Sequence, residues 1–222
     1  GNIFEVAYAR FGEENSINKD RLEGLNKRKF ELINSTDRNI ITTVNKNRKG
    51  YRANSRGNLD SILSSCTHIL INGIEREITP EDIMRIKLTD LSFLKEGLQT
   101  EAFAYRSFNY EPSKFENIES NLIFVGIIAL ENPLIDDVSD DIDRMIDLGV
   151  LPIIFTDDNN ISAEFFGRKI GLISNEDQIA SGMELESLND EELINRVSRA
   201  RIYCKVNPEL RNRIISLYNQ DG

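Results

Sequence analysis

The chain has 222 residues and a mass of 25.4 kDa, enough for one large domain or two modest ones, each with a buried core. It carries 27 Lys and Arg against 37 Asp and Glu, a net charge of −10, which argues against nucleic acid or an anionic membrane surface as a partner. A hydrophobic content of 40% with 29% charged residues is typical of a folded globular chain.

The first 120 residues alternate polar, Asn-rich segments with short runs typical of β-strands. These runs are 39–44, 67–71 and 100–105. Between the last two, the sequence predicts a helix: Thr79 is a typical N-cap, Pro80 suits the first helical position, and Gly97 provides the stop. We therefore expect antiparallel strands with helices packed on them in this half.

After residue 120, strands and helices alternate. The expected order is strand Leu122–Leu130 with both faces covered, a helix starting in an Asp-rich segment near 136, strand 150–155, helix 162–170, strand 201–204, and a last helix capped by Asn207. Strands separated by helices of this length predict a parallel sheet. Because proline cannot donate to a ladder, Pro152 predicts that its strand begins late or lies near an edge.

Thr156, Asp157 and Asp158 follow a predicted strand and precede a predicted helix. A hydroxyl, free backbone N–H groups and the helix dipole can hold a phosphate there, and a carboxylate can orient Mg²⁺ or water. Lys205 and Arg211 flank the start of the last helix and can neutralise phosphate charge. The alternative is a polar turn with a helix cap and two solvated surface cations.

Two cysteines, Cys66 and Cys204, and one histidine, His68, leave little for a disulfide framework, a zinc site or a histidine-centred triad. We expect a buried cysteine and a surface or hydrogen-bonded histidine at 66 and 68. This cysteine usage is typical of a reducing, cytoplasmic setting.

Nine segments resemble, in order, the motifs of the P-type cation-transporting ATPases, closest to their calcium-pump-like and sodium-pump-like branches. In the first half, 1–7 resembles GDPTEGA, 33–38 resembles FNSTNK or FDSxRK, 56–67 resembles KGAPExxLxxCT, and 97–106 resembles GLRTLAFAYR. Further on, 124–134 resembles FVGxxxxxDPPR, 148–159 resembles AGIKVIMITGDN, 168–171 resembles AREIGI, 181–193 resembles TGxELexLSdeEL, and 203–211 resembles FARVSPExK. The matches run from the first residue to nearly the last.

The resemblance implies two domains. Residues 1–130 would be most of an α+β nucleotide-binding domain with an antiparallel sheet, and 131–222 part of an α/β phosphorylation domain with an incomplete, haloacid-dehalogenase-like, Rossmann-type parallel sheet. It also implies ATP and Mg²⁺ as ligands, the transmembrane and actuator domains of a pump as partners, and a place on the cytoplasmic face of a membrane without insertion of this segment.

The resemblance further implies roles for twelve positions. In the first half these are Glu5 near the adenine, Ile33 at the position of a base-stacking phenylalanine, Arg38 and Arg56 at two lysines of the nucleotide site, Gly57 and Asn58 as backbone that the nucleotide approaches, and Gln99 at a phosphate-facing arginine. In the second half they are Thr156, Asp157 and Asp158 near the γ-phosphate and Mg²⁺, and the cationic positions Lys205 and Arg211.

Several motif positions depart from the family. The stacking phenylalanine aligns with Ile33, or with a neighbour if the loop carries a deletion, and Gln99 lacks the charge of arginine. Asp157 replaces a glycine and should repel a γ-phosphate. The DKTGT motif with the phosphorylated aspartate and the TGDGVND motif do not occur, so we expect a piece of a larger pump that presents ATP to an aspartate outside this chain and cannot complete the reaction alone.

Three alternatives stay open. A degenerate headpiece would bind ATP poorly and serve as an interaction or regulatory module. A stand-alone haloacid-dehalogenase-like phosphatase would need a DxD-type aspartate after an N-terminal strand, which the first residues do not contain. The third alternative is an α/β domain without a ligand.

Overall fold

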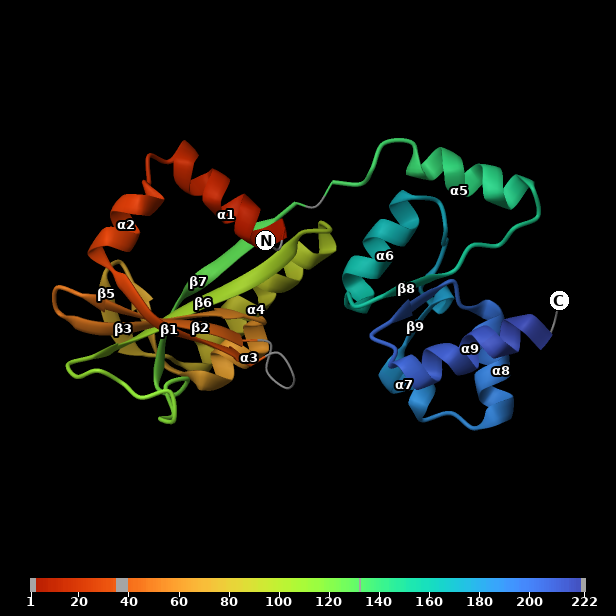
Figure 1. Cartoon of the computed structure of the whole chain (residues 1–222). Helices are drawn as coiled ribbons and strands as arrows, with labels where there is room; N and C mark the ends of the chain where they lie inside the picture. The colour runs from red at the N-terminus through yellow and green to blue at the C-terminus, as the bar shows by residue number, and fades with distance from the viewer. Residues whose placement is uncertain (1–2, 35–39, 132, 221–222) are drawn as a thin grey trace. The chain divides into compact units, whose positions relative to one another are not determined.

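The computed structural model describes residues 3–34, 40–131 and 133–220. The chain divides into two compact units (Figure 1). Unit 1 consists of Gly1–Phe93 and Gln99–Leu130, and unit 2 consists of Leu94–Leu98 and Glu131–Gly222.

The part of the chain up to residue 130 forms helices around one sheet. Its elements are α1 (Ile3–Glu14), α2 (Lys19–Leu25), β1 (Lys27–Asn34), β2 (Ile40–Asn47), β3 (Gly50–Gly57), α3 (Leu59–Ser65), β4 (Cys66–Ile71), β5 (Ile74–Glu77), α4 (Pro80–Lys95), β6 (Gln99–Phe108) and β7 (Leu122–Leu130). The described strands pair in the order β1-β2-β3-β6-β7-β4-β5. Every neighbouring pair is antiparallel except β4 and β7, which run parallel, so the sheet is mixed and mostly antiparallel.

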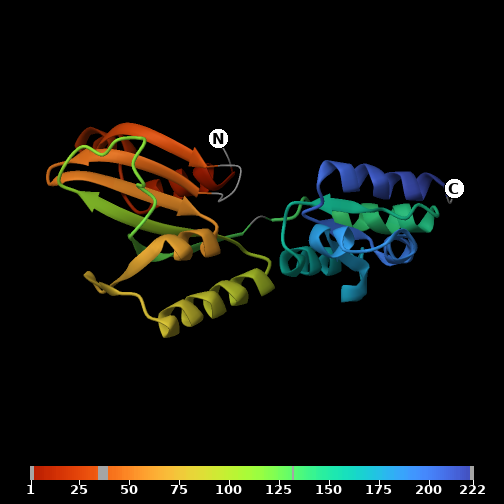
Figure 2. The same ribbon diagram turned by 90° about the horizontal axis from the view of Figure 1, so that it is seen from below.

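One face of this sheet packs against α3 and α4 (Figure 2). The alternation of side chains along a strand explains the choice of residues: Ile40, Thr42 and Val44 are fully buried, whereas Ile41 and Thr43 between them are only half-buried. The opposite face, here called the open face, is only partly covered, by α1. The expectation that β7 is covered on both faces is therefore wrong: Val125 of β7 is 47% exposed.

The helix predicted after Thr79 is confirmed as α4. The N–H and hydroxyl of Thr79 both donate to the carboxylate of Asp82, at 3.0 Å each, and the Asp82 N–H returns a bond to the Thr79 hydroxyl at 3.2 Å. Beyond the helix, Gly97 has a φ of +75°, in the left-handed region that ends helices and favours glycine. The cap and the stop thus act as their residue types predict.

Unit 2 contains a small parallel sheet with helices. Its elements are α5 (Val138–Asp147), β8 (Ile154–Thr156), α6 (Asn160–Lys169), a 3₁₀ turn (Glu176–Gln178), β9 (Ile179–Ser181), α7 (Gly182–Glu186), α8 (Asp190–Arg199), β10 (Ile202–Cys204) and α9 (Pro208–Gln220). The strand order is β8-β10-β9, with both pairs parallel. β8 begins two residues after Pro152 and lies at an edge, as the proline predicts.

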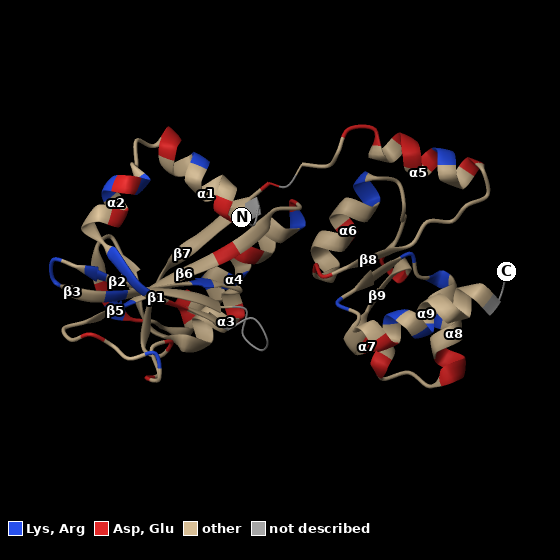
Figure 3. Cartoon of the chain, viewed as in Figure 1, with Lys and Arg blue, Asp and Glu red and all other residues tan. Residues whose placement is uncertain are grey.

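Acidic residues gather at helix starts in unit 2 (Figure 3). They occupy the first turn of α5, with Asp140 and Asp141, and the first turn of α8, with Asp190, Glu191 and Glu192. Negative charge at these positions complements the positive end of the helix dipole. Within the described ranges, the helices lack the combination of length and apolar character that a bilayer crossing requires.

Candidate functional site

A row of side chains crosses the open face of the sheet near the end of β3. Ile33 of β1 lies opposite Ile41 of β2. Ile41 in turn lies opposite Arg56 of β3, and Arg56 lies opposite Phe103 of β6. Since directly opposed residues point to the same face, strand pairing brings two positions with implied roles, Ile33 and Arg56, into one row.

Arg56 connects this row to α1. One terminal nitrogen of its guanidinium donates to Glu5 of α1 at 2.9 Å, and the other lies 2.9 and 3.2 Å from the two carboxylate oxygens of Glu101 on β6. The hydroxyl of Tyr8 donates to Glu101, and the Tyr8 ring meets Phe103 edge-on with centroids 5.6 Å apart. The structure thus brings Glu5 and Arg56 together.

These charges differ in their access to water. The side chains of Arg56 and Glu101 are 18% and 13% exposed, whereas that of Glu5 is 52% exposed. Burial, followed by the bond to Glu101, raises the pKa of Tyr8 above its ordinary value, so Tyr8 remains a hydrogen-bond donor at physiological pH. Two carboxylates surround one guanidinium, so the cluster of Glu5, Arg56 and Glu101 has an excess of one negative charge.

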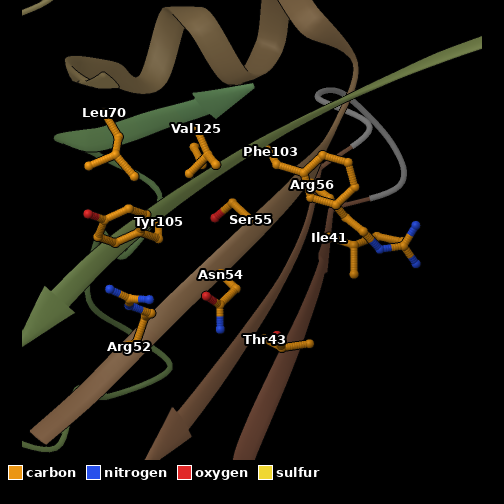
Figure 4. A pocket seen from close by; sticks show the side chains of 11 residues that line it. Ile41, Thr43, Arg52, Asn54, Ser55, Arg56, Leu70, Phe103, Tyr105 and Val125 are labelled. Atoms are coloured by element: carbon orange, nitrogen blue, oxygen red, sulfur yellow. The ribbon is translucent and has the colours of Figure 1, made fainter. Parts of the chain in front are cut away.

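A cavity of about 400 Å³ lies on the open face, and Arg56 is one of the residues that line it (Figure 4). Small-molecule sites typically have volumes of about 300–1,000 Å³. Phe103 and Ile41 contribute apolar walls, and Arg52 stacks on the ring of Tyr105 with 4.1 Å between the guanidinium carbon and the centroid. The lining residues are Ile41, Thr43, Arg52, Asn54, Ser55, Arg56, Leu70, Phe103, Ala104, Tyr105 and Val125.

Gly57 and Asn58 follow Arg56 where β3 leads into α3. Gly57 has a φ of +156° and is buried, a backbone conformation that favours glycine. The side chain of Asn58 caps α3 by accepting from the N–H groups of Asp60 at 3.0 Å and Ser61 at 3.4 Å. Since the Asn58 side-chain oxygen is used by the cap, its local role is structural.

The remaining positions of the first half differ in their surroundings. Ile33 is 64% exposed on β1. Gln99 is the first residue of β6 and pairs with Leu130. Because side chains alternate along a strand, Gln99 and Glu101, two residues apart, lie on the same face of β6. Arg38 lies outside the described residues.

In unit 2, polar groups meet at the carboxyl end of the parallel sheet. The Thr156 hydroxyl donates to Asp158 Oδ2 at 2.9 Å and accepts from the Asp158 N–H at 3.1 Å. Lys205 follows β10, and its backbone N–H donates to the Thr156 carbonyl at 2.8 Å. Parallel pairing of Thr156 with Cys204 therefore brings Thr156, Asp158 and Lys205 together.

Three residues near this corner, Asp157, Asn159 and Arg211, take no part in the hydrogen bonds between Thr156 and Asp158. Asp157 is exposed, and Asn159 caps α6 through the N–H groups of Ile161 and Ser162, each at 3.0 Å. The guanidinium of Arg211 lies over the ring of Phe155, 4.8 Å from its centroid.

In the described residues, no group of three or more His, Cys, Asp or Glu side chains is arranged to hold a metal ion. The half-buried carboxylate of Asp158 is the kind of oxygen donor that Mg²⁺ takes together with substrate phosphates.

Cys66 and His68 have ordinary surroundings. Burial raises the pKa of the half-buried Cys66 thiol to about 12. The ring of His68 forms a 2.9 Å hydrogen bond between Nδ1 and the Thr67 hydroxyl, as a hydrogen-bonded histidine was expected to do.

Sequence reasoning missed Glu101 and Tyr8. Glu101 stands where the GLRTLAFAYR motif has a leucine, and this exchange of an apolar for a charged residue was the available signal. Tyr8 directly follows the segment that resembles GDPTEGA, and nothing in its spacing indicates a partner 93 residues away.

Known proteins resemble this chain over its full length. The family described as P-type ATPase, cytoplasmic domain N, matches residues 1–136. A calcium-transporting ATPase of Bacillus cereus is 28% identical over the whole chain and 25% of its own length, and one of Listeria monocytogenes is 24% identical over the same shares. A magnesium-transporting P-type ATPase of Escherichia coli is 27% identical over 83% of the chain and 20% of its own length.

The chain thus spans about a quarter of the length of the first two relatives. The family match covers more than half of its residues, and the relatives extend the similarity beyond residue 136. The chain therefore belongs to the P-type cation-transporting ATPases, as a portion of their cytoplasmic region.

Proposed function

We propose that this chain is the ATP-binding headpiece of a P-type cation-transport ATPase. Residues 1–130 form most of the nucleotide-binding domain, and 131–222 form part of a haloacid-dehalogenase-like phosphorylation domain. The γ-phosphate is presented to an aspartate outside this chain. The observation that supports this most is that strand pairing and the contact from α1 bring Ile33, Arg56 and Glu5, three positions to which the resemblance assigns nucleotide roles, to the face of the sheet that carries the cavity.

The chemistry of this cavity suits a nucleotide. Apolar side chains at Ile41 and Phe103 line the cavity and offer contact area for a base, with Ile33 next in the same row, and the guanidinium of Arg56 offers hydrogen-bond donors to the nucleotide. By analogy with the family, the backbone at Gly57 and Asn58 is where the nucleotide approaches the chain. Gln99 offers hydrogen bonds without the charge of arginine, so this position contributes less to phosphate binding than the arginine of the family motif. Arg38, which lies outside the described residues, is the second cation that the resemblance assigns to the nucleotide site.

The corner of unit 2 suits the phosphate end of the ligand. Thr156 supplies a hydroxyl, Asp158 a carboxylate and Lys205 a cation, with Arg211 nearby on α9. Mg²⁺, when bound, neutralises phosphate charge, and Asp158 would hold it together with ligands that lie mostly outside this chain. Asp157 adds a carboxylate that opposes a γ-phosphate.

The relatives suggest the rest of the assembly. Two are named as calcium-transporting and one as magnesium-transporting ATPases. By analogy, the parent protein moves a cation through transmembrane helices, hydrolyses ATP through an aspartyl-phosphate, and holds this headpiece on the cytoplasmic face of its membrane beside an actuator domain.

Calorimetric titration of the 222-residue chain with ATP tests the proposal. Saturable binding with a Kd in roughly the micromolar to millimolar range is expected, and adenosine should compete for the same site. Absence of heat up to about 10 mM ATP, with and without Mg²⁺, would contradict it.

A second candidate is a degenerate headpiece that has become an interaction or regulatory module. It is favoured by the pairing of Arg56 with two carboxylates and by the aliphatic Ile33 at the stacking position. Both features reduce what the cavity offers to a nucleotide. The same titration separates the two candidates.

A further inference from the structure

We infer that Asn54 and Arg52 of β3 select the base of the bound nucleotide. They present a fixed hydrogen-bond acceptor beside a fixed donor in the open-face cavity, the complement of the amino group and ring nitrogen N1 of adenine. This inference rests on the proposed function and adds to it a reason for binding ATP rather than a 6-oxopurine nucleotide. Neither residue is among the twelve positions to which the resemblance gives a role.

Strand pairing places the two residues beside the edge of the base that faces away from the phosphates. Along the open face, β3 presents Arg56, Asn54 and Arg52 in this order. Two residues of a strand span about 6.6 Å, so Asn54 lies one such step from Arg56 and Arg52 lies two. Gln99, the phosphate-facing position, lies on β6 beyond Arg56 in the opposite direction. A nucleotide with its base at Glu5 and Arg56 and its phosphates toward Gln99 therefore turns the far edge of the base toward Asn54.

A chain of amide hydrogen bonds fixes which end of Asn54 faces a ligand. The backbone carbonyl of Asn26 can only accept, and it accepts from Nδ2 of Asn45 at 2.9 Å. Oδ1 of Asn45 in turn accepts from Nδ2 of Asn54 at 3.4 Å. Because its amino group is engaged in this way, Asn54 has its oxygen left for the cavity, on the side of Arg52 (Figure 4). A ligand atom that meets this oxygen must be a donor.

Arg52 provides the neighbouring donor. Its guanidinium stacks on the ring of Tyr105, with 4.1 Å between the guanidinium carbon and the ring centroid. The Tyr105 hydroxyl donates to Glu75 at 2.6 Å, which holds the ring in place under the guanidinium. Stacking uses the flat face of the guanidinium, so its in-plane N–H groups remain available to an acceptor of the ligand.

This pair of groups distinguishes adenine from hypoxanthine. The edge of adenine opposite the sugar carries an amino group, which donates, next to N1, which accepts. The Asn54 oxygen and the Arg52 N–H groups match both. Hypoxanthine carries an oxygen in place of the amino group and a hydrogen on N1, so acceptor meets acceptor and donor meets donor. Because a site built to hydrogen-bond a ligand is left with unpaired polar groups by such an analogue, it rejects the analogue.

Calorimetry with ATP and with ITP, whose base is hypoxanthine, tests the inference on the 222-residue chain. Wild type should bind ITP about tenfold more weakly than ATP or worse. Asn54→Ala removes the acceptor and should lower this ratio of Kd values at least about threefold, and Arg52→Leu, which removes the donor, should lower it as well. Asn109→Ala is the matched control: Asn109 is an exposed asparagine of the same unit outside this cavity, and its loss should leave the ratio unchanged.

Two substitutions of Asn45 test the orientation of Asn54. Asn45 does not line the cavity, but without its side chain the Asn54 amide is free to turn its amino group toward the oxygen of hypoxanthine. Asn45→Ala should therefore lower the ratio although Asn54 is retained. Asn45→Asp still accepts from the Asn54 amino group and should keep the preference. Thermal melts show that each variant is folded.

The outcomes separate this inference from the proposed function. A wild-type ratio near one, or a ratio that neither Asn54→Ala nor Arg52→Leu lowers, overturns the inference while ATP binding by wild type still supports the proposed function. An equal fall of the ratio in Asn109→Ala overturns it too. Failure of wild type to bind either nucleotide up to about 10 mM contradicts the proposed function and this inference together.

Discussion

The guanidinium of Arg56 on β3 lies 2.9 Å from the carboxylate of Glu5 on α1, although the two residues are 51 positions apart. This contact, with the bond from Tyr8 to Glu101, ties α1 to the open face of the sheet beside the cavity. Changes at Arg56 are therefore expected to affect both ligand binding and the attachment of α1.

Arg56→Gln should weaken ATP binding by about tenfold or more, because a charged hydrogen-bond donor to the nucleotide is lost. Arg56→Lys, which keeps the charge, should retain most of the affinity. Calorimetry measures both values. The control is Arg48→Gln, at an exposed position in the turn between β2 and β3; equal losses in Arg48→Gln and Arg56→Gln would mean that only the net charge of the unit matters.

Asp82→Asn should lower the thermal midpoint of unit 1 by about 5 °C or more, because it weakens a buried hydrogen-bond network. The Asp82 side chain is 3% exposed and accepts from Arg76 at 2.6 and 2.9 Å, from Arg85 at 2.6 Å, and from Thr79. Glu81→Gln, at an exposed position of the same helical turn, should change the midpoint little.

The Asp82 network also predicts a pH dependence. Bonds from Arg76 and then from the Thr79 backbone hold the pKa of Asp82 well below its usual range. Its stabilising effect should therefore be complete above the unfolded-state pKa of about 3.9 and disappear as the pH falls through the lower folded-state pKa. The difference in midpoint between wild type and Asp82→Asn should shrink on acidification; a difference that grows instead would contradict this account.

Gly182→Ala should destabilise unit 2 by about 1–3 kcal/mol. A Cβ at Gly182 would lie 2.3 Å from the Lys205 carbonyl oxygen, a backbone atom that cannot move without shifting the loop after β10. Gly24→Ala within α2 should instead stabilise unit 1, by about 0.5–1 kcal/mol, because alanine favours a helix more than glycine does. A Cβ at Gly24 would have no heavy atom of the described residues within 4 Å, so it would meet no clash. Urea unfolding monitored in each unit measures both.

Both cysteines should react slowly with iodoacetamide in the folded chain at about pH 8. Burial raises the pKa of Cys66 to about 12, and burial with the nearby charge of Asp158 raises that of Cys204 to about 11, so the reactive thiolate is scarce. Alkylation should be at least about 100-fold slower than in urea. Since these pKa values lie above the unfolded value of about 8.5, stability should fall as the pH rises beyond that value.

Elements with strong local signals could be predicted from the sequence. Thr79 and Pro80 mark the start of α4, Asn207 caps α9 by accepting from the Leu210 N–H at 2.8 Å, and Pro152 delays β8. Each of these depends on a cap or on a missing N–H group, which acts within a few residues. The three-residue strand β9 was missed because a segment that short shows no periodicity.

Long-range relationships could not be predicted in the same way. The parallel pairing of β4 with β7 depends on how segments far apart in the chain meet, and the exposure of Val125 depends on which face the helices cover; no local pattern specifies either. Motif order indicated that Glu5 and Arg56 belong to one site, but Glu101 reaches Arg56 across 45 positions. No local pattern indicates this contact, which strand pairing creates by placing Glu101 beside the guanidinium.

Amide spectra of the nitrogen-15-labelled chain, recorded during titration with ATP, show whether the nucleotide binds at the open face of the sheet. We expect saturable shift changes that concentrate around Glu5, Arg56, Gly57 and Phe103. A spectrum unchanged at millimolar ATP, or changes confined to the remote edge strand β5, would contradict it.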